Sequence, residues 1–151
     1  MKLKSGDVAP DFELPSSDGT TFKLKTYHDK KLVIFFYPRD ATPGCTIESC
    51  RFRDKYEDFL ELGTTVVGIS SDSIESHKKF CRNHSLQYPV LSDSAGKVRK
   101  LYGASSVNGI LPDRVTFLID RKGIIHDVFS SQLQVLKHVD WALKWAKSTS
   151  N

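Results

Sequence analysis

Two short stretches without hydrophobic–polar alternation predict the centre of the fold. Leu32 to Tyr37 is an unbroken apolar run, and Thr64 to Ser70 is a second segment rich in β-branched residues. Runs of this kind are typical of strands buried on both faces. Between them, from Cys45 to about Gly63, the apolar spacing changes to that of a helix. This order predicts a β-α-β unit with two parallel strands.

The remaining elements follow from alternation, helical spacing and turn residues. Residues 12–14 and 21–24 alternate around the turn sequence at 15–19, which predicts a peripheral β-hairpin near the N-terminus. Asp72 or Ser73 can cap the helix that follows the second buried strand. The further expected elements are helices at 72–85, 94–102 and 135–146, a strand at 88–91, a loop at 103–112, and a hairpin of 114–120 and 124–129.

Composition and charge narrow the class of protein. The 151 residues, 39% of them hydrophobic, suit one compact domain spanning residues 1–151. The net charge of +4 is modest and its signs are interspersed, so we expect no nucleic-acid partner. No run approaches the ~20 apolar residues of a membrane helix. With no signal-like segment at Met1 to Gly6, we expect a cytoplasmic protein, or a plastid protein if a transit peptide has been removed.

The most distinctive chemistry lies between the first buried strand and the long helix. Pro43 and Gly44 interrupt regular structure, so Cys45 falls at the start of the helix. The first helical turn presents unpaired N–H groups and the positive end of the macrodipole, which favour a thiolate over a thiol. Cys50 points roughly 140° away from Cys45 on a helical wheel. Without a secretory signal, the three cysteines are expected to be reactive or buried thiols.

The pattern Pro38-x-x-x-Thr42-x-x-Cys45 resembles the active-site motif of the peroxiredoxins, thiol peroxidases that reduce hydroperoxides at a cysteine. Cys50, five positions later, is similar to the second cysteine of the peroxiredoxin Q (bacterioferritin comigratory protein) subfamily. The resemblance implies a thioredoxin-like α/β fold, in which a central mixed sheet is flanked by helices and carries the N-terminal hairpin as an extension. It covers nearly the whole chain, including residues 6–12, 67–70, 91–93 and 112–120.

The resemblance also implies roles for single residues. Cys45 would attack the hydroperoxide and become a sulfenic acid, a second thiol would form a disulfide with it, and thioredoxin or a similar reductant would restore both. Thr42 would hold the thiolate and a peroxide oxygen, and Arg114 would stabilise the thiolate and the charge on the departing oxygen. Pro38 would exclude water. The resemblance implies no cofactor and no metal, and the subfamily is often monomeric.

The second thiol has two candidates. In a regular helix, residues five apart lie roughly 8 to 9 Å apart at Cα, beyond the ~7 Å within which a disulfide closes, so Cys45 and Cys50 can bond only if the helix start unwinds. We nevertheless favour Cys50, because its spacing is that of the commoner subfamily pattern and a short loop closes at low entropic cost. Cys81 is the alternative, since some family members carry this cysteine in the next helix.

Other interpretations compete with these assignments. Arg114 could form a surface ion pair and Thr42 could be a plain helix cap. Glu48 matches an acidic family position, but an exposed helix carboxylate is nearly as good an explanation. A disulfide reductase is disfavoured, because it would have two residues between its cysteines rather than four. A redox-sensing or metal-binding module could use His77, Cys81 and His84, which share one helical face, but no fourth ligand is evident and we expect an ordinary surface stripe.

Overall fold

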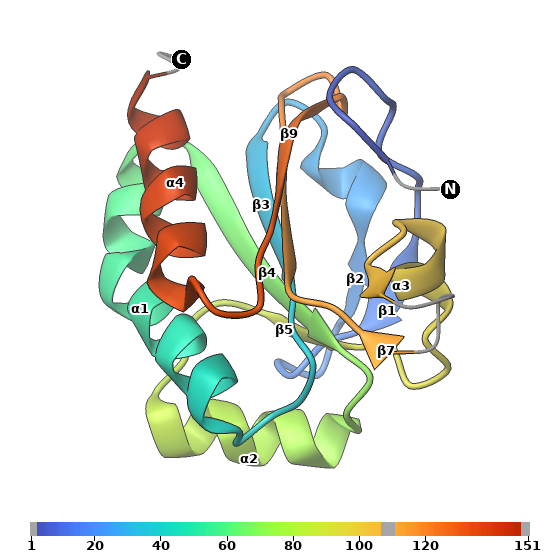
Figure 1. The fold of residues 1–151 in the computed structure, drawn as a ribbon, viewed down its shortest axis with the longest axis vertical. Helices are drawn as coiled ribbons and strands as arrows, with labels where there is room; N and C mark the ends of the chain where they lie inside the picture. Colours follow the sequence, from blue (N-terminus) through green and yellow to red (C-terminus); the bar gives the residue numbers. More distant parts are fainter. Residues whose placement is uncertain (1–2, 107–110, 149–151) are drawn as a thin grey trace.

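A five-stranded mixed sheet forms the centre of the computed structural model, which describes residues 3–106 and 111–148 (Figure 1). The strand order is β5-β4-β3-β8-β9; β3, β4 and β5 are parallel, and β8 runs antiparallel to both β3 and β9. The expected α/β, thioredoxin-like fold is confirmed. The strands are β3 (Lys31–Phe36), β4 (Thr64–Ser70), β5 (Val90–Ser92), β8 (Val115–Ile119) and β9 (Ile125–Ser130).

The two strands without alternation are central, as predicted. Every residue of β3 is buried, and the strand pairs with β4 on one side and β8 on the other. Gly68 of β4 lies against the Phe35 ring, where an added Cβ would come within 2.8 Å of a ring carbon. The pair therefore packs closely only because residue 68 has no side chain.

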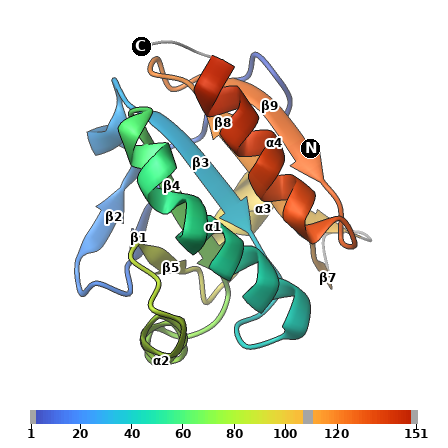
Figure 2. The ribbon, with the colours of Figure 1, turned by 90° about the vertical axis from the view of Figure 1, so that its left-hand side faces the viewer.

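The two faces of the sheet bury separate apolar clusters. Helices α1 (Pro43–Glu61) and α4 (Val135–Ser148) lie side by side over one face, where Cys45 belongs to the cluster (Figure 2). The other face is covered by the hairpin of β1 (Glu13–Pro15) and β2 (Thr21–Lys23), the 3-10 turn Leu24–Tyr27 and α3 (Lys97–Leu101). Helix α2 (Ile74–His84) lies at the end of the sheet where β3 leads into α1 (Figure 1).

The segment after β5 differs from the expectation in two ways. Helix α3 begins only at Lys97, because Gly96 adopts a left-handed φ of 69° and the Asp93 carboxylate accepts the N–H groups of Val98 and Arg99. The expected loop at 103–112 contains a short antiparallel pair, and its residues 107–110 lie outside the described ranges. The pair consists of β6 (Ser105–Ser106) and β7 (Leu111–Pro112). Within the described ranges, no helix is long and apolar enough to cross a membrane.

Candidate active site

Cys45 lies in the first turn of α1 with only 1% of its surface exposed. The first backbone bond of the helix runs from the Thr46 N–H to the Thr42 carbonyl at 2.9 Å. The N–H groups of Gly44 and Cys45 precede that bond and belong to the unpaired donors of a helix start. The buried sulfur therefore lies beside the positive end of a helix, and its position at the helix start is the one the sequence predicted.

Arg114 brings a fixed positive charge to this sulfur. The residue immediately precedes β8, is buried, and places Nη2 3.5 Å from the Sγ of Cys45, 69 residues away in sequence. An added Cβ at Gly44 would lie 3.1 Å from Nη2, so the glycine leaves room for the guanidinium. A surface ion pair for Arg114 is thus the wrong description.

The partner of Arg114 is Glu48, and it is fully buried rather than exposed. Nη1 of Arg114 donates to Oε1 of Glu48 at 2.6 Å. Glu48 follows Cys45 by three residues, so its side chain lies about 60° from that of Cys45 around the helix axis. It is therefore on the same inward face of α1. Burial raises the pKa of Glu48, while the charge of Arg114 and its hydrogen bond act in the opposite direction. The ion pair fixes the guanidinium against the cysteine.

His138 of α4 lies behind this ion pair, and no sequence signal pointed to it. Its Nδ1 is 3.8 Å from Oε2 of Glu48 and 2.8 Å from the Thr116 hydroxyl, and its Nε2 is 2.8 Å from the Ser131 carbonyl. A carbonyl can only accept, so Nε2 carries the proton and Nδ1 accepts from Thr116. Burial lowers the pKa of His138 to about 4, and the nearby Arg114 adds to this effect. His138 is therefore neutral near pH 7.

This lowered pKa predicts an acid-sensitive contribution to stability. Between pH 6.5 and 4 the imidazole of His138 takes up a proton in the unfolded chain but not in the folded one, so the free energy of unfolding falls as the pH falls. Relative to His138→Gln, we expect the wild-type protein to lose up to about 3 kcal/mol across this window. Urea unfolding at pH 7 and pH 4.5 measures the difference; parallel pH curves for the two proteins would contradict it.

Thr42 and Pro38 both lie in the loop that joins β3 to α1. The Thr42 hydroxyl donates to the Arg39 carbonyl at 2.9 Å and makes no side-chain cap bond to the helix. Pro38 is half-buried where β3 ends. Between them, Ala41 has a left-handed φ of 64°, an uncommon conformation for a residue with a side chain.

The expectation that the stripe on α2 lies at the surface is wrong for His77, because this side chain is fully buried. Its Nδ1 lies 2.7 Å from Oδ2 of Asp40, and its Nε2 lies 2.9 Å from the Leu91 carbonyl. Asp40 also accepts hydrogen bonds from Tyr37 and Ser76. These bonds tie the loop before α1 to helix α2, and they give His77 a structural explanation that needs no metal.

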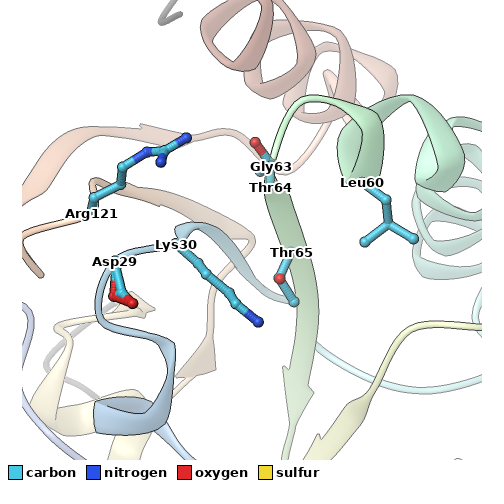
Figure 3. Close-up of a pocket in the computed structure, with 7 residues that line it drawn as sticks. All are labelled: Asp29, Lys30, Leu60, Gly63, Thr64, Thr65 and Arg121. Atoms are coloured by element: carbon cyan, nitrogen blue, oxygen red, sulfur yellow. The ribbon is translucent and has the colours of Figure 1, made fainter. Parts of the chain in front are cut away.

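A surface hollow at another place on the sheet holds none of the predicted site residues. Figure 3 shows this hollow near the end of α1 and the start of β4. One of its lining residues, Lys30, immediately precedes β3, so the hollow lies where that strand begins. Cys45 instead follows the last residue of β3, in the first turn of α1. The lining residues are Asp29, Lys30, Leu60, Gly63, Thr64, Thr65 and Arg121.

A thioredoxin-like fold with a buried cysteine beside an arginine at a helix start defines a thiol peroxidase of the peroxiredoxin class. The model of the AhpC/TSA family matches residues 5–128, and the chain belongs to that family as a peroxiredoxin of the Q type. Comparison with individual proteins thus confirms the resemblance and a peroxidase activity that takes a hydroperoxide and a thiol reductant.

Three relatives illustrate the match. "Peroxiredoxin Q, chloroplastic" from Populus jackii is 42% identical over 148 residues, which cover 97% of this chain and 70% of that protein. Peroxidoxin BcpB from Mycobacterium tuberculosis superposes with a TM-score of 0.90 at 38% identity, covering 99% of each chain. A cysteine-to-serine mutant of peroxiredoxin Q from Xanthomonas campestris has a TM-score of 0.85 at 29% identity, covering 91% of this chain and 90% of that one.

Proposed function

We propose that Cys45 is the peroxidatic cysteine and that Arg114 and the N–H groups of Gly44 and Cys45 stabilise its reaction. The observation that carries this proposal is the 3.5 Å contact between Arg114 and the sulfur at the start of α1. The thiolate attacks one peroxide oxygen, the O–O bond breaks, and the departing oxygen leaves as water or an alcohol after taking a proton. The positive groups lie where negative charge develops.

Thr42 and Pro38 complete the proposed pocket. After rotating away from the Arg39 carbonyl, the Thr42 hydroxyl can hold the thiolate or a peroxide oxygen. Pro38 limits the access of water from the end of β3. The product at Cys45 is a sulfenic acid, which condenses with a second thiol to a disulfide.

Cys50 is the resolving thiol that we favour. Cys45 and Cys50 both lie within α1, so the first turns must unwind before their sulfurs can meet. The helix start has the fewest backbone bonds to lose, and Pro43 and Gly44 precede the cysteine there. Cys81 is a second candidate for a specific reason. Xanthomonas campestris peroxiredoxin Q structures include serine mutants at cysteines numbered 48 and 84 in that protein, which differ by 36, as do Cys45 and Cys81 here.

Peptide mapping of the oxidised protein tests this proposal. We expect a bond between Cys45 and Cys50, and we expect Cys50→Ser to lose recycling by thioredoxin while Cys81→Ser keeps it, because only one thiol resolves the sulfenic acid. The measurement is mass spectrometry after one equivalent of peroxide, followed by turnover with thioredoxin and its reductase. A bond between Cys45 and Cys81, with the opposite behaviour of the two variants, would assign resolution to Cys81.

We further propose that thioredoxin or a similar protein is the reductant and that the chain acts as a monomer. The chloroplastic relatives support a plastid location as the alternative to the cytoplasm. Light scattering of the reduced and oxidised protein tests the oligomeric state, and fractionation of the source cells tests the compartment.

A further inference from the structure

Cys50, the second cysteine of α1, also has an arginine in contact with its sulfur. Arg53 lies one turn after Cys50 and places Nη1 3.6 Å from the Sγ of Cys50. The same Nη1 donates to the His84 carbonyl at the end of α2, at 2.8 Å. Nε and Nη2 of Arg53 both donate to Oδ1 of Asp54, at 3.0 and 2.9 Å. The guanidinium is therefore held in place from two sides and directed at the sulfur.

We propose that Arg53 is a positioning residue for the resolving step, which it serves by favouring the thiolate of Cys50 and by keeping this part of α1 on α2. The inference rests on the proposed role of Cys50. Arg53 contacts Cys50 in the same way that Arg114 contacts Cys45, because in each pair a guanidinium nitrogen lies within 3.6 Å of the sulfur. A thiolate, not a thiol, is the nucleophile in disulfide formation.

The step balances without any further reactant. The Cys50 thiol loses its proton, its sulfur attacks the sulfur of the Cys45 sulfenic acid, the S–S bond forms and the S–O bond breaks. The hydroxide that leaves takes up the proton as water, and the two electrons that reduce the sulfenic sulfur come from the Cys50 thiolate. The guanidinium of Arg53, 3.6 Å from the Cys50 sulfur, lies where it stabilises the negative charge that this sulfur carries as it attacks.

The contacts around Cys50 also decide which cysteine moves. Arg53 is bonded to α2, and the Tyr88 hydroxyl donates to the Ser49 carbonyl at 2.8 Å, so the turn that carries Cys50 is fixed from two directions. Cys45 lies at the helix start, where the backbone has fewer bonds. Unwinding would therefore bring Cys45 toward a stationary Cys50.

The charges that face Cys50 can be named. Arg53 supplies the positive charge, and the carboxylate of Asp54, more than half exposed, offsets part of it through solvent. From the neighbouring elements come the His84 carbonyl of α2, which accepts from the same Nη1 of Arg53, and the buried phenol of Tyr88, whose pKa burial raises well above its ordinary value. Tyr88 is thus neutral near pH 7, and Arg53 carries the one fixed positive charge in hydrogen-bond contact with Cys50 among the described residues.

A first experiment tests the contact without using peroxidase turnover. In a Cys45→Ser, Cys81→Ser protein, only Cys50 can be alkylated, and its rate with iodoacetamide is measured from pH 5 to 10. We expect Arg53→Gln to slow alkylation at pH 7 by roughly threefold to tenfold and to move the profile to higher pH. Arg53→Lys should restore part of the rate, because it keeps the charge.

Arg51→Gln is the matched control. Arg51 lies on the same helix and pairs with Asp140 at 3.0 Å on the surface, so its loss should leave the alkylation profile unchanged. An arginine that only held the helices together would lower the thermal unfolding midpoint in Arg53→Gln without moving the pH profile. Identical profiles for Arg53→Gln and its parent would overturn the proposal.

A second experiment measures the resolving step in the otherwise unaltered protein. Stopped-flow fluorescence should show unchanged sulfenic acid formation in Arg53→Gln and disulfide formation slowed by a similar factor, and mass spectrometry should show more sulfinic acid at Cys45 under excess peroxide. Unchanged disulfide formation overturns the role of Arg53. Cys50→Ser then locates the failure: if it still forms a Cys45 disulfide, the proposed function of Cys50 is also wrong, and if it does not, only Arg53 is misassigned.

Discussion

Cys45→Ser is expected to abolish peroxide turnover, by at least about 10⁴-fold, while the fold stays intact. Serine has nearly the size of cysteine and fits the buried position, which is only 1% exposed. Its hydroxyl is not ionised near pH 7, so the contact with Arg114 would no longer hold a nucleophile. Peroxide consumption with a thiol reductant measures the loss.

The circular dichroism spectrum of this variant should match that of the wild-type protein. Its free energy of unfolding should differ only by the effect of one buried hydroxyl, about 1 to 3 kcal/mol. Cys81→Ser, a change of the same chemical kind on α2, is the control for general damage. Substantial turnover by Cys45→Ser would place the reacting sulfur elsewhere and end the assignment of the site.

Arg114→Ala should slow the attack on peroxide by about 10² to 10³-fold, because it removes the charged donor where negative charge develops. The variant should still fold. Burial raises the pKa of Glu48 and the charge of Arg114 lowers it, so without its partner this carboxyl takes up a proton instead of remaining as an unpaired buried charge. Stopped-flow measurement of sulfenic acid formation gives the rate.

Arg114→Lys separates charge from geometry. A lysine keeps the positive charge but has one nitrogen, whereas the guanidinium reaches both Glu48 through Nη1 and Cys45 through Nη2. We therefore expect an intermediate rate. If Arg114→Ala reacted within threefold of the wild-type rate and lost only stability, the ion pair would be structural and the proposed catalytic role would be withdrawn.

Local patterns predicted the parts of this molecule that depend on neighbouring residues in the chain. The missing alternation in β3 and β4 identified the buried strands, and Pro43 and Gly44 placed Cys45 at a helix start. These features arise from backbone sterics and burial within a few residues of each other. The contact of Arg114 with the cysteine spans 69 residues and was expected only through the family resemblance.

Residues whose surroundings come from packing were missed or misjudged. The sequence left Glu48 between an acidic family position and an exposed helix carboxylate, because its burial depends on how α4 and β8 pack against α1. His138 meets Thr116 and Glu48 only after α4 has docked, so no local signal pointed to it. His77 seemed to belong to a surface stripe, because the buried Asp40 that binds it comes from the loop before α1.

The division of the apolar core by the sheet gives the molecule two halves with different tasks. Cys45 belongs to the cluster beneath α1 and α4, whereas the hairpin and α3 close a separate cluster on the opposite face. The unwinding that we propose for the start of α1 thus loosens one half and leaves the other as a fixed frame. Each redox cycle can then proceed by local melting alone, without passing through an unfolded chain that is prone to aggregate.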